Sequence, residues 1–482
     1  MSEPPGDRPI ADRQSGVGDL AIVLHSHMPY VEGFGTYPFG EEWLFDAAIR
    51  SHLPILDFAH DLTVTVTPVL ADQFEAPGVA ERLREFLVNH RIEAAAKDID
   101  SAQPEYRAAA EAEHDRYLHA LNVLDRHQGE VTGAFADAQN SGRISLAASS
   151  ATHAVLPLMA SRRGIDLQVE TGLRSHRRRF GWLGGFWLPE CAYVPGLEWD
   201  LARNGVEWFC VDQSQHETGD DALMPVRTEA GPVAFTIDWP SISWLWDMRG
   251  YPSWPGYVDF HRLSMNGIRI FGIDGEPYDP AAAAAHVSGQ ADRFIDDAVS
   301  RLEAFRERTG ETGLMVFAVD TELLGHWWTE GPAWLECVLE RAAGQGLRLV
   351  TLDQAAAGGE TRDIELKPSS WGEDKNFTTW DEPAVADLAW GARRLELEVS
   401  RAVAGGLDRN RAERAARELL AVQSSDWAFL DNRKQAGDYP YERATRHAEQ
   451  AYEALQSDPH EHLDSRVRSL APDLSLTPLL TP

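Results

Sequence analysis

Short apolar runs alternate with longer segments of helical spacing along most of the chain. The runs are rich in β-branched and aromatic residues and are bounded by turns, which is typical of βαβ units around a parallel sheet. Seven runs are predicted strands: LAIVLHSH (20–27), LTVTVTPVL (62–70), RISLAAS (143–149), LGGFWLPE (183–190), VEWFCVD (206–212), PVAFTID (232–238) and LMVFAVD (314–320). GLRLVTL (346–352) is a candidate eighth or edge strand.

Two regions carry helical spacing without strand signals. Residues 75–140 are charged and Ala-rich, which predicts a helical insertion between the second and third strands. Strand signals stop near residue 372, and the amphipathic segments beyond it predict a helical region packed against the sheet domain. We therefore expect a loose N-terminal tail over 1–17, an α/β domain over 18–365 with its insertion at about 75–140, and a helical domain over 366–482.

Charge and composition narrow the class of ligand. The formal net charge is −32, from 44 Lys and Arg against 76 Asp and Glu. A field of that sign repels nucleic acid and anionic membranes and favours a neutral or cationic ligand. Sixteen tryptophans are many for 482 residues. Indole rings suit the apolar faces of sugars as well as a protein core.

The cysteines and the N-terminus bear on the compartment. Cys191, Cys210 and Cys337 do not make a disulfide framework. The polar N-terminus lacks the basic start and apolar stretch of a signal peptide. No run approaches the length needed to span a bilayer. We therefore expect a cytoplasmic protein with neither nucleic acid nor membrane as a partner.

Polar side chains end several of the predicted strands. In a β/α barrel, reactive residues gather at the carboxyl ends of the strands. The residues in such places are His25, His27, Gln73, His153, Glu190, Asp212, Asp238 and Asp320. A barrel would bring them to one mouth although they come from different strands.

Glu190 and Asp320 stand out among these residues by their context. Glu190 lies in GGFWLPECAY, and Asp320 follows the most apolar strand in FAVDTELLGHWW. Glycosidic cleavage needs two carboxyl groups, one to attack C1 and one to protonate the leaving oxygen, about 5–5.5 Å apart in a retaining enzyme. A single carboxylate after an apolar run is more often a helix cap or an ion-pair member. Nearby tryptophans at 187, 327 and 328 favour the catalytic interpretation.

The histidines permit two interpretations. His25 and His27 form the His-x-His pattern of metal-dependent hydrolases on barrels, which His153 and Asp320 would complete as a ligand set. Alternatively, neutral imidazoles bind sugar hydroxyls and orient the nucleophile. The spacing favours neither. Cys191 has no Cys/His/Asn constellation that would make it a nucleophile.

Longer motifs resemble glycoside hydrolase family 57, the retaining α-glucan enzymes, and within it the 1,4-α-glucan branching enzymes. The similarity extends over nearly the whole chain past residue 18. The matching segments are HSHMPYV (25–31), ATHAVLPLM (151–159), GFWLPECAYVPG (185–196), FAVDTELLGHWWTEGP (317–332), SSWGEDKNFTTW (369–380) and VQSSDWAFLDNRKQAGDY (422–439). The third and fourth matches are long and specific.

The resemblance implies an incomplete TIM-like (β/α)7 barrel followed by a helical domain that contributes to the cleft. It implies Glu190 as nucleophile and Asp320 as general acid/base, with no metal and no other cofactor. It implies a donor-side pocket shaped by His25, His27, His153, Trp187 and Cys191. It implies stacking of the glucan on Trp246, Trp371, Trp380 and Trp427. The expected partner is an α-glucan such as amylose or a glycogen-like or modified glucan, bound by a monomer or weak homo-oligomer.

The chain departs from the family pattern at three places. Residues 212–231 contain no Tyr, although branching members often carry one on a mobile loop there. Ile237 stands where an Arg is expected, and the segment between Tyr257 and Tyr278 is short. These departures bear on transfer more than on cleavage. Three alternatives remain. They are an amylase or 4-α-glucanotransferase of the same family, a metal-dependent hydrolase or deacetylase, and an inactive glucan-binding protein.

Overall fold

The computed structural model describes residues 16–32, 39–101, 103–216, 221–358, 361–456 and 469–480. Nine strands in these ranges form one sheet. The strands are β1 (Gly18–Ser26), β2 (Leu62–Val66), β3 (Ile144–Ser149), β4 (Gly185–Trp187), β5 (Trp208–Val211), β6 (Val226–Arg227), β7 (Val233–Thr236), β8 (Leu314–Asp320) and β9 (Leu347–Leu349).

The sheet curls into an incomplete barrel. Its order is β6-β7-β5-β4-β3-β2-β1-β8, with β9 paired to the start of β1, and every pairing is parallel except that of β6 with β7. The amide of Asp238, just beyond β7, donates to the carbonyl of Val316 in β8 at 2.8 Å. The two sides of the sheet therefore approach each other, and the carboxyl ends of the parallel strands surround one mouth.

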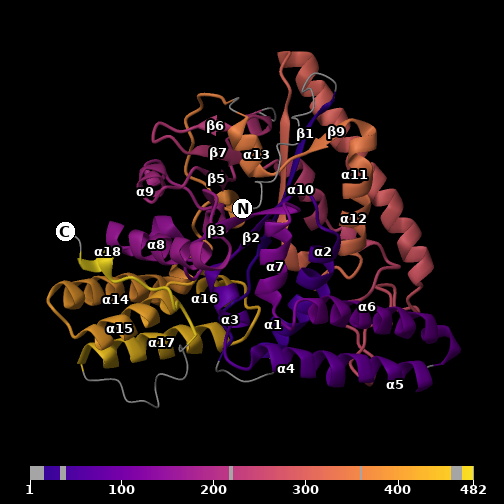
Figure 1. The fold of residues 1–482 in the computed structure, drawn as a ribbon, viewed down its shortest axis with the longest axis horizontal. Helices are drawn as coiled ribbons and strands as arrows, with labels where there is room; N and C mark the ends of the chain where they lie inside the picture. The colour runs from indigo at the N-terminus through magenta and orange to yellow at the C-terminus, as the bar shows by residue number, and fades with distance from the viewer. Residues whose placement is uncertain are drawn as a thin grey trace, which may run out of the picture.

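Helices surround this barrel and lie beyond its mouth. The helices of the barrel part are α1 (Glu41–Ala47), α2 (Leu53–Phe58), α3 (Pro68–Phe74), α4 (Val79–Glu85), α5 (Glu93–Ser101), α6 (Arg107–Arg126), α7 (Val131–Asn140), α8 (Arg162–Arg179), α9 (Leu197–Arg203), α10 (Trp239–Trp246), α11 (Pro280–Thr309), α12 (Gly331–Ala342) and α13 (Leu352–Ala357). The C-terminal helices are α14 (Ala386–Ala404), α15 (Arg409–Val422), α16 (Ser425–Asn432), α17 (Tyr439–Gln456) and α18 (Thr477–Leu480). Below the strands in Figure 1, the C-terminal helices fill the left and the insertion helices α4 to α6 the right.

Apart from the edge strands β6 and β9, the strands are buried on both faces, which explains their continuous apolar runs. Packing at the centre leaves no spare room. A Cβ added at Gly185 in β4 would lie 2.2 Å from the indole ring of Trp208 in β5. Gly185 therefore lets β4 pass directly over that ring.

The predicted fold class is confirmed, although one strand ends earlier than predicted and one short strand was not predicted. All seven predicted strands are present, and the candidate eighth is β9. The second strand is shorter than expected, ending at Val66, because Pro68 begins α3. The two-residue β6 was not predicted. Residues 1–15 of the expected tail lie outside the described residues. None of the described helices has the length and apolarity to cross a membrane.

Candidate active site

Two strands on the same sheet end in the two candidate carboxylates. Asp320 is the last residue of β8 and stands in register with His25 of β1. Glu190 follows β4 by three residues, in a 3₁₀ turn at Pro189–Cys191. Both side chains therefore come to the barrel mouth, as the sequence predicted.

The backbone around Glu190 is strained. Glu190 and Cys191 have φ values of 59° and 48°, and His153, four residues beyond the neighbouring strand β3, has 58°. Left-handed conformations cost non-glycine residues about 1–2 kcal/mol each and persist only where surrounding contacts hold them. One such contact is the Trp371 amide, which donates to the Glu190 carbonyl at 2.7 Å. The Glu190 side chain leaves this strained turn to lie beside Ser425 and His153.

Three histidines form a stack beside Glu190. The rings of His27 and His153 lie 4.0 Å apart at 20°, and those of His25 and His153 lie 4.9 Å apart at 25°. His25 also stacks on the fully buried Trp187 at 4.8 Å. Cys191 is fully buried, and burial raises the pKa of its thiol, which keeps that thiol protonated.

A chain of hydrogen bonds runs through the stack to Glu190. Ser425 Oγ donates to Glu190 Oε1 at 3.1 Å, so its lone pair accepts from His153 Nδ1 at 2.8 Å. His153 Nε2 then accepts from His25 Nε2 at 2.9 Å, and His25 Nδ1 accepts from Thr65 Oγ1 at 2.6 Å. This direction requires both imidazoles to be neutral. Burial agrees, because it lowers the pKa of His25 and His153 well below the ordinary value.

The start of helix α16 supplies two side chains to this site. Besides Ser425, Asp426 Oδ1 pairs with His27 Nε2 at 3.0 Å. Burial lowers the pKa of His27, but Asp426, Glu322 and Glu190 together outweigh burial and raise that pKa, which favours an imidazolium. Sequence reasoning named Trp427 in this segment and missed its two polar neighbours. The available signal was SSD, residue types that often begin a helix, inside the family-like segment 422–439.

Burial and repulsion by neighbouring carboxylates raise the pKa values of both carboxyl groups. Burial, then the charges of Asp320 and Asp426, raises the pKa of Glu190 to about 8. Burial, then the charge of Glu322, raises the pKa of Asp320 to about 7. Two such groups titrate as a pair and hold one proton between them near neutral pH. The pKa of Glu190 is the higher of the two, so the shared proton lies mainly on Glu190 in this geometry. Attack by Glu190 requires the opposite placement, which the Ser425 hydrogen bond favours because it lowers the pKa of Glu190.

A cleft of about 900 Å³ opens beside Asp320. We call it the Asp320 cleft. Among its lining residues are Trp246, 56% exposed on α10, and Trp327, 45% exposed on the loop after β8. Glu190 is not among them. The cleft therefore reaches the acid/base candidate from one side, and Trp246 has an open ring face for the predicted sugar contact.

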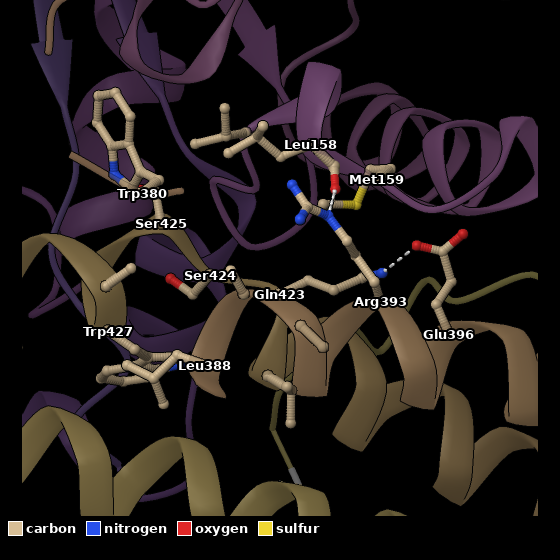
Figure 2. A pocket seen from close by; sticks show the side chains of 15 residues that line it. Leu158, Met159, Trp380, Leu388, Arg393, Glu396, Gln423, Ser424, Ser425 and Trp427 are labelled. Carbon is tan, nitrogen blue, oxygen red and sulfur yellow. Dashed lines mark hydrogen bonds between the residues drawn. The ribbon is translucent and has the colours of Figure 1, made fainter. Parts of the chain in front are cut away.

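The other three predicted stacking residues are placed differently. Trp371 is half-buried, with its ring edge-on to Trp187 at 5.0 Å. Trp380 and Trp427 line a separate cavity of about 60 Å³, between the C-terminal helices and the loop at Leu158 (Figure 2). Trp427 is 1% exposed and its indole N–H donates to the Ala421 carbonyl. Trp427 therefore belongs to the helical core, and the predicted stacking is corrected because neither face of its ring is open.

The cavity in Figure 2 lies at the interface between the barrel and the C-terminal helices, which hydrogen bonds hold together. Arg393 Nε of α14 donates across it to the Leu158 carbonyl at 3.0 Å, and within the helical region Gln423 Nε2 donates to Glu396 Oε2 at 3.0 Å. Ser425 lines the same cavity. The Ser425 amide donates to the His153 carbonyl at 3.2 Å, which fixes the start of α16 where Ser425 reaches Glu190.

The histidine geometry bears on the two interpretations that the spacing left open. Both ring nitrogens of His25, His27 and His153 are engaged in hydrogen bonds with protein side chains. Within the described ranges, no three or more His, Cys, Asp or Glu side chains are arranged to hold a metal ion. The arrangement matches the interpretation in which the imidazoles orient a carboxylate.

Comparisons with known sequences agree with the motifs. The model of "Glycosyl hydrolase family 57" matches residues 21–367, and that of "1,4-alpha-glucan branching enzyme, C-terminal" matches residues 391–473. A Mycobacterium tuberculosis protein named "Probable 1,4-alpha-glucan branching enzyme" is 32% identical over 487 residues. That match covers 89% of this chain and 90% of the relative.

Solved structures of similar fold agree with the family match. A GH57-type branching enzyme from Pyrococcus horikoshii superposes with a TM-score of 0.90 at 29% identity, covering 96% of this chain and 97% of the other. The α-amylase AmyC from Thermotoga maritima gives a TM-score of 0.85 at 25% identity, covering 96% and 99%. The resemblance inferred from the motifs is confirmed: this chain belongs to glycosyl hydrolase family 57.

Proposed function

We propose that this protein is a retaining 1,4-α-glucan branching enzyme, with Glu190 as nucleophile and Asp320 as general acid/base. The observation that carries the mechanism is the placement of two carboxyl groups with raised pKa values at one barrel mouth. The match of residues 391–473 to the C-terminal region of branching enzymes supports the transfer outcome. The substrate is an α-glucan such as amylose or a glycogen-like polymer.

The first step breaks an α-1,4 bond. A carboxylate oxygen of Glu190 bonds to C1, and the electron pair of the C1–O4 bond leaves with O4. Asp320 gives its proton to that oxygen. Ser425 supports this step by holding Glu190 Oε1 in place and favouring its ionised form.

The second step transfers the glucan. A 6-hydroxyl oxygen of an acceptor chain bonds to C1, the ester bond to Glu190 breaks, and its electron pair returns to the carboxylate. The hydroxyl proton goes to Asp320, which restores both groups. Water in place of the acceptor gives hydrolysis, as in an α-amylase, and a 4-hydroxyl gives disproportionation. Acceptor placement and water exclusion decide among these outcomes.

Incubation with amylose, followed by iodine staining and a reducing-end assay, tests the proposal. Branching lowers the iodine absorbance while reducing ends stay nearly constant. Glu190→Gln should abolish the change in absorbance. Reducing ends that rise in proportion to the loss of absorbance would assign an α-amylase instead.

A further inference from the structure

Two aromatic rings form a wall of the Asp320 cleft. Phe260 and Trp327 lie with ring centroids 4.6 Å apart at 37°, and both line the cleft. Trp327 is 45% exposed although it is a large apolar side chain. Phe260 belongs to the short segment between Tyr257 and Tyr278, so the wall joins that segment to the loop after β8.

Buried polar groups hold this aromatic wall from behind. The Arg269 guanidinium lies 4.5 Å over the Phe260 ring and donates to the His326 carbonyl at 2.8 Å. Asp46 Oδ2 accepts from His326 Nδ1 at 2.9 Å and from Arg269 at 3.3 Å. Arg269, Asp46 and His326 are each at least nine-tenths buried. The wall is therefore fixed before any ligand arrives, which lowers the entropy lost on binding.

The position of the wall identifies which sugar it meets. Asp320 lines this cleft and Glu190 does not. Under the proposed function, on which this inference rests, Asp320 protonates the leaving oxygen and later takes the proton of the incoming hydroxyl. The sugar on that side is the leaving chain in the first step and the acceptor in the second.

We infer that Phe260 and Trp327 bind the acceptor glucan and set the balance between transfer and hydrolysis. Pyranose C–H faces stack on flat aromatic rings, as apolar surface removed from water. An acceptor held there places its hydroxyl near C1 of the glycosyl-enzyme and displaces water from Asp320. The C1–ester bond then breaks as the C1–O bond to the acceptor forms, and the hydroxyl proton goes to Asp320. Water attacks by the same route when the wall is empty.

Trp327→Ala and Phe260→Leu test this role on the full-length protein. The readout with amylose is the number of transfer events per new reducing end, in which transfer to 6-hydroxyls is counted as α-1,6 linkages and transfer to 4-hydroxyls from the change in chain-length distribution. We expect this ratio to fall about tenfold in each variant. Fluoride release from α-maltosyl fluoride without acceptor should stay within about twofold of wild type, because the donor side is unchanged. Trp327→Phe should retain most of the wild-type ratio of transfer to new reducing ends, because it keeps an aromatic ring at this position.

The matched control is Trp199→Ala, because Trp199 is 50% exposed on α9 and does not line the cleft. It should leave both readouts unchanged. A variant ratio equal to that of wild type would overturn the acceptor role. A parallel fall in fluoride release would also overturn it, by assigning the wall to the donor. Wild-type enzyme that transfers only to 4-hydroxyls would refute the proposed branching function and leave the inference standing.

Discussion

Removal of the Ser425 hydroxyl should raise the pKa of Glu190 without unfolding the protein. Ser425→Ala deletes the donor to Glu190 Oε1, and His153 Nδ1 lies 3.7 Å from the same oxygen, too far to replace it. Hydrogen bonds to charged groups contribute about 1.5–3 kcal/mol. The 3.1 Å length favours the lower value, about 1.5 kcal/mol.

That energy corresponds to a shift of about one unit in the pKa of Glu190. The bond stabilises the charged form, so its loss raises the pKa, and a smaller fraction of Glu190 is ionised at a given pH. The acid limb of the kcat/KM profile should therefore move to higher pH by about one unit. On that limb kcat/KM should fall about tenfold.

The assay is fluoride release from α-maltosyl fluoride across the pH range. Ser425→Thr keeps a hydroxyl and should restore the limb. Ser400→Ala is the matched control, because Ser400 is a buried serine of α14 whose hydroxyl has no hydrogen-bond partner in the described structure. An acid limb of Ser425→Ala within about 0.2 units of wild type, a margin of about 0.3 kcal/mol, would refute the reasoning.

Three further predictions follow from named contacts. With α-maltosyl fluoride and azide, Glu190→Gly should give the β-azide and Asp320→Ala the α-azide, because only the first variant lacks the covalent step. Identical anomers from both would exclude these roles. Gly185→Ala should lower the unfolding free energy by about 1–3 kcal/mol, because the added methyl group overlaps the Trp208 indole ring. Gly289→Ala is its control and should raise that free energy slightly, because no neighbouring atom in the described structure lies within 4 Å of the added methyl group. Urea unfolding measures both changes. Burial raises the pKa of Glu113, but Arg50, Arg116 and Arg269 together outweigh burial and lower that pKa from 4.5 to about 2. Its stability contribution is thus complete above pH 4.5 and lost toward pH 2. Glu113→Gln should cost about 3 kcal/mol at pH 7, and a cost that does not shrink between pH 4.5 and 2 would contradict this.

The sequence was most informative where strands end. A buried strand needs an apolar run, so a polar residue directly after one marks the barrel mouth. Glu190 and Asp320 could therefore be located from the order of residues along the chain. The same rule placed His25, His27 and His153 there, but spacing could not assign their hydrogen-bond partners.

The contributions of the C-terminal helices were harder to predict. Ser425 lies 235 residues from Glu190 along the chain, and only the packing of α16 on the barrel brings them together. Trp427 drew attention because aromatic rings suit sugars, yet its ring points into the helical core while its small neighbours face the site. Residue type alone does not give the direction of a side chain on a helix. The wall of Phe260 and Trp327 similarly depends on Arg269, whose role no local pattern indicates.

The measurement that tests the central claim most directly is proton NMR of amylose incubated with the wild-type enzyme. It counts anomeric signals of α-1,6 linkages against those of reducing ends. The account predicts many new α-1,6 signals for each new reducing end. Reducing ends without α-1,6 signals would contradict branching, even if Glu190 and Asp320 proved to be the catalytic pair.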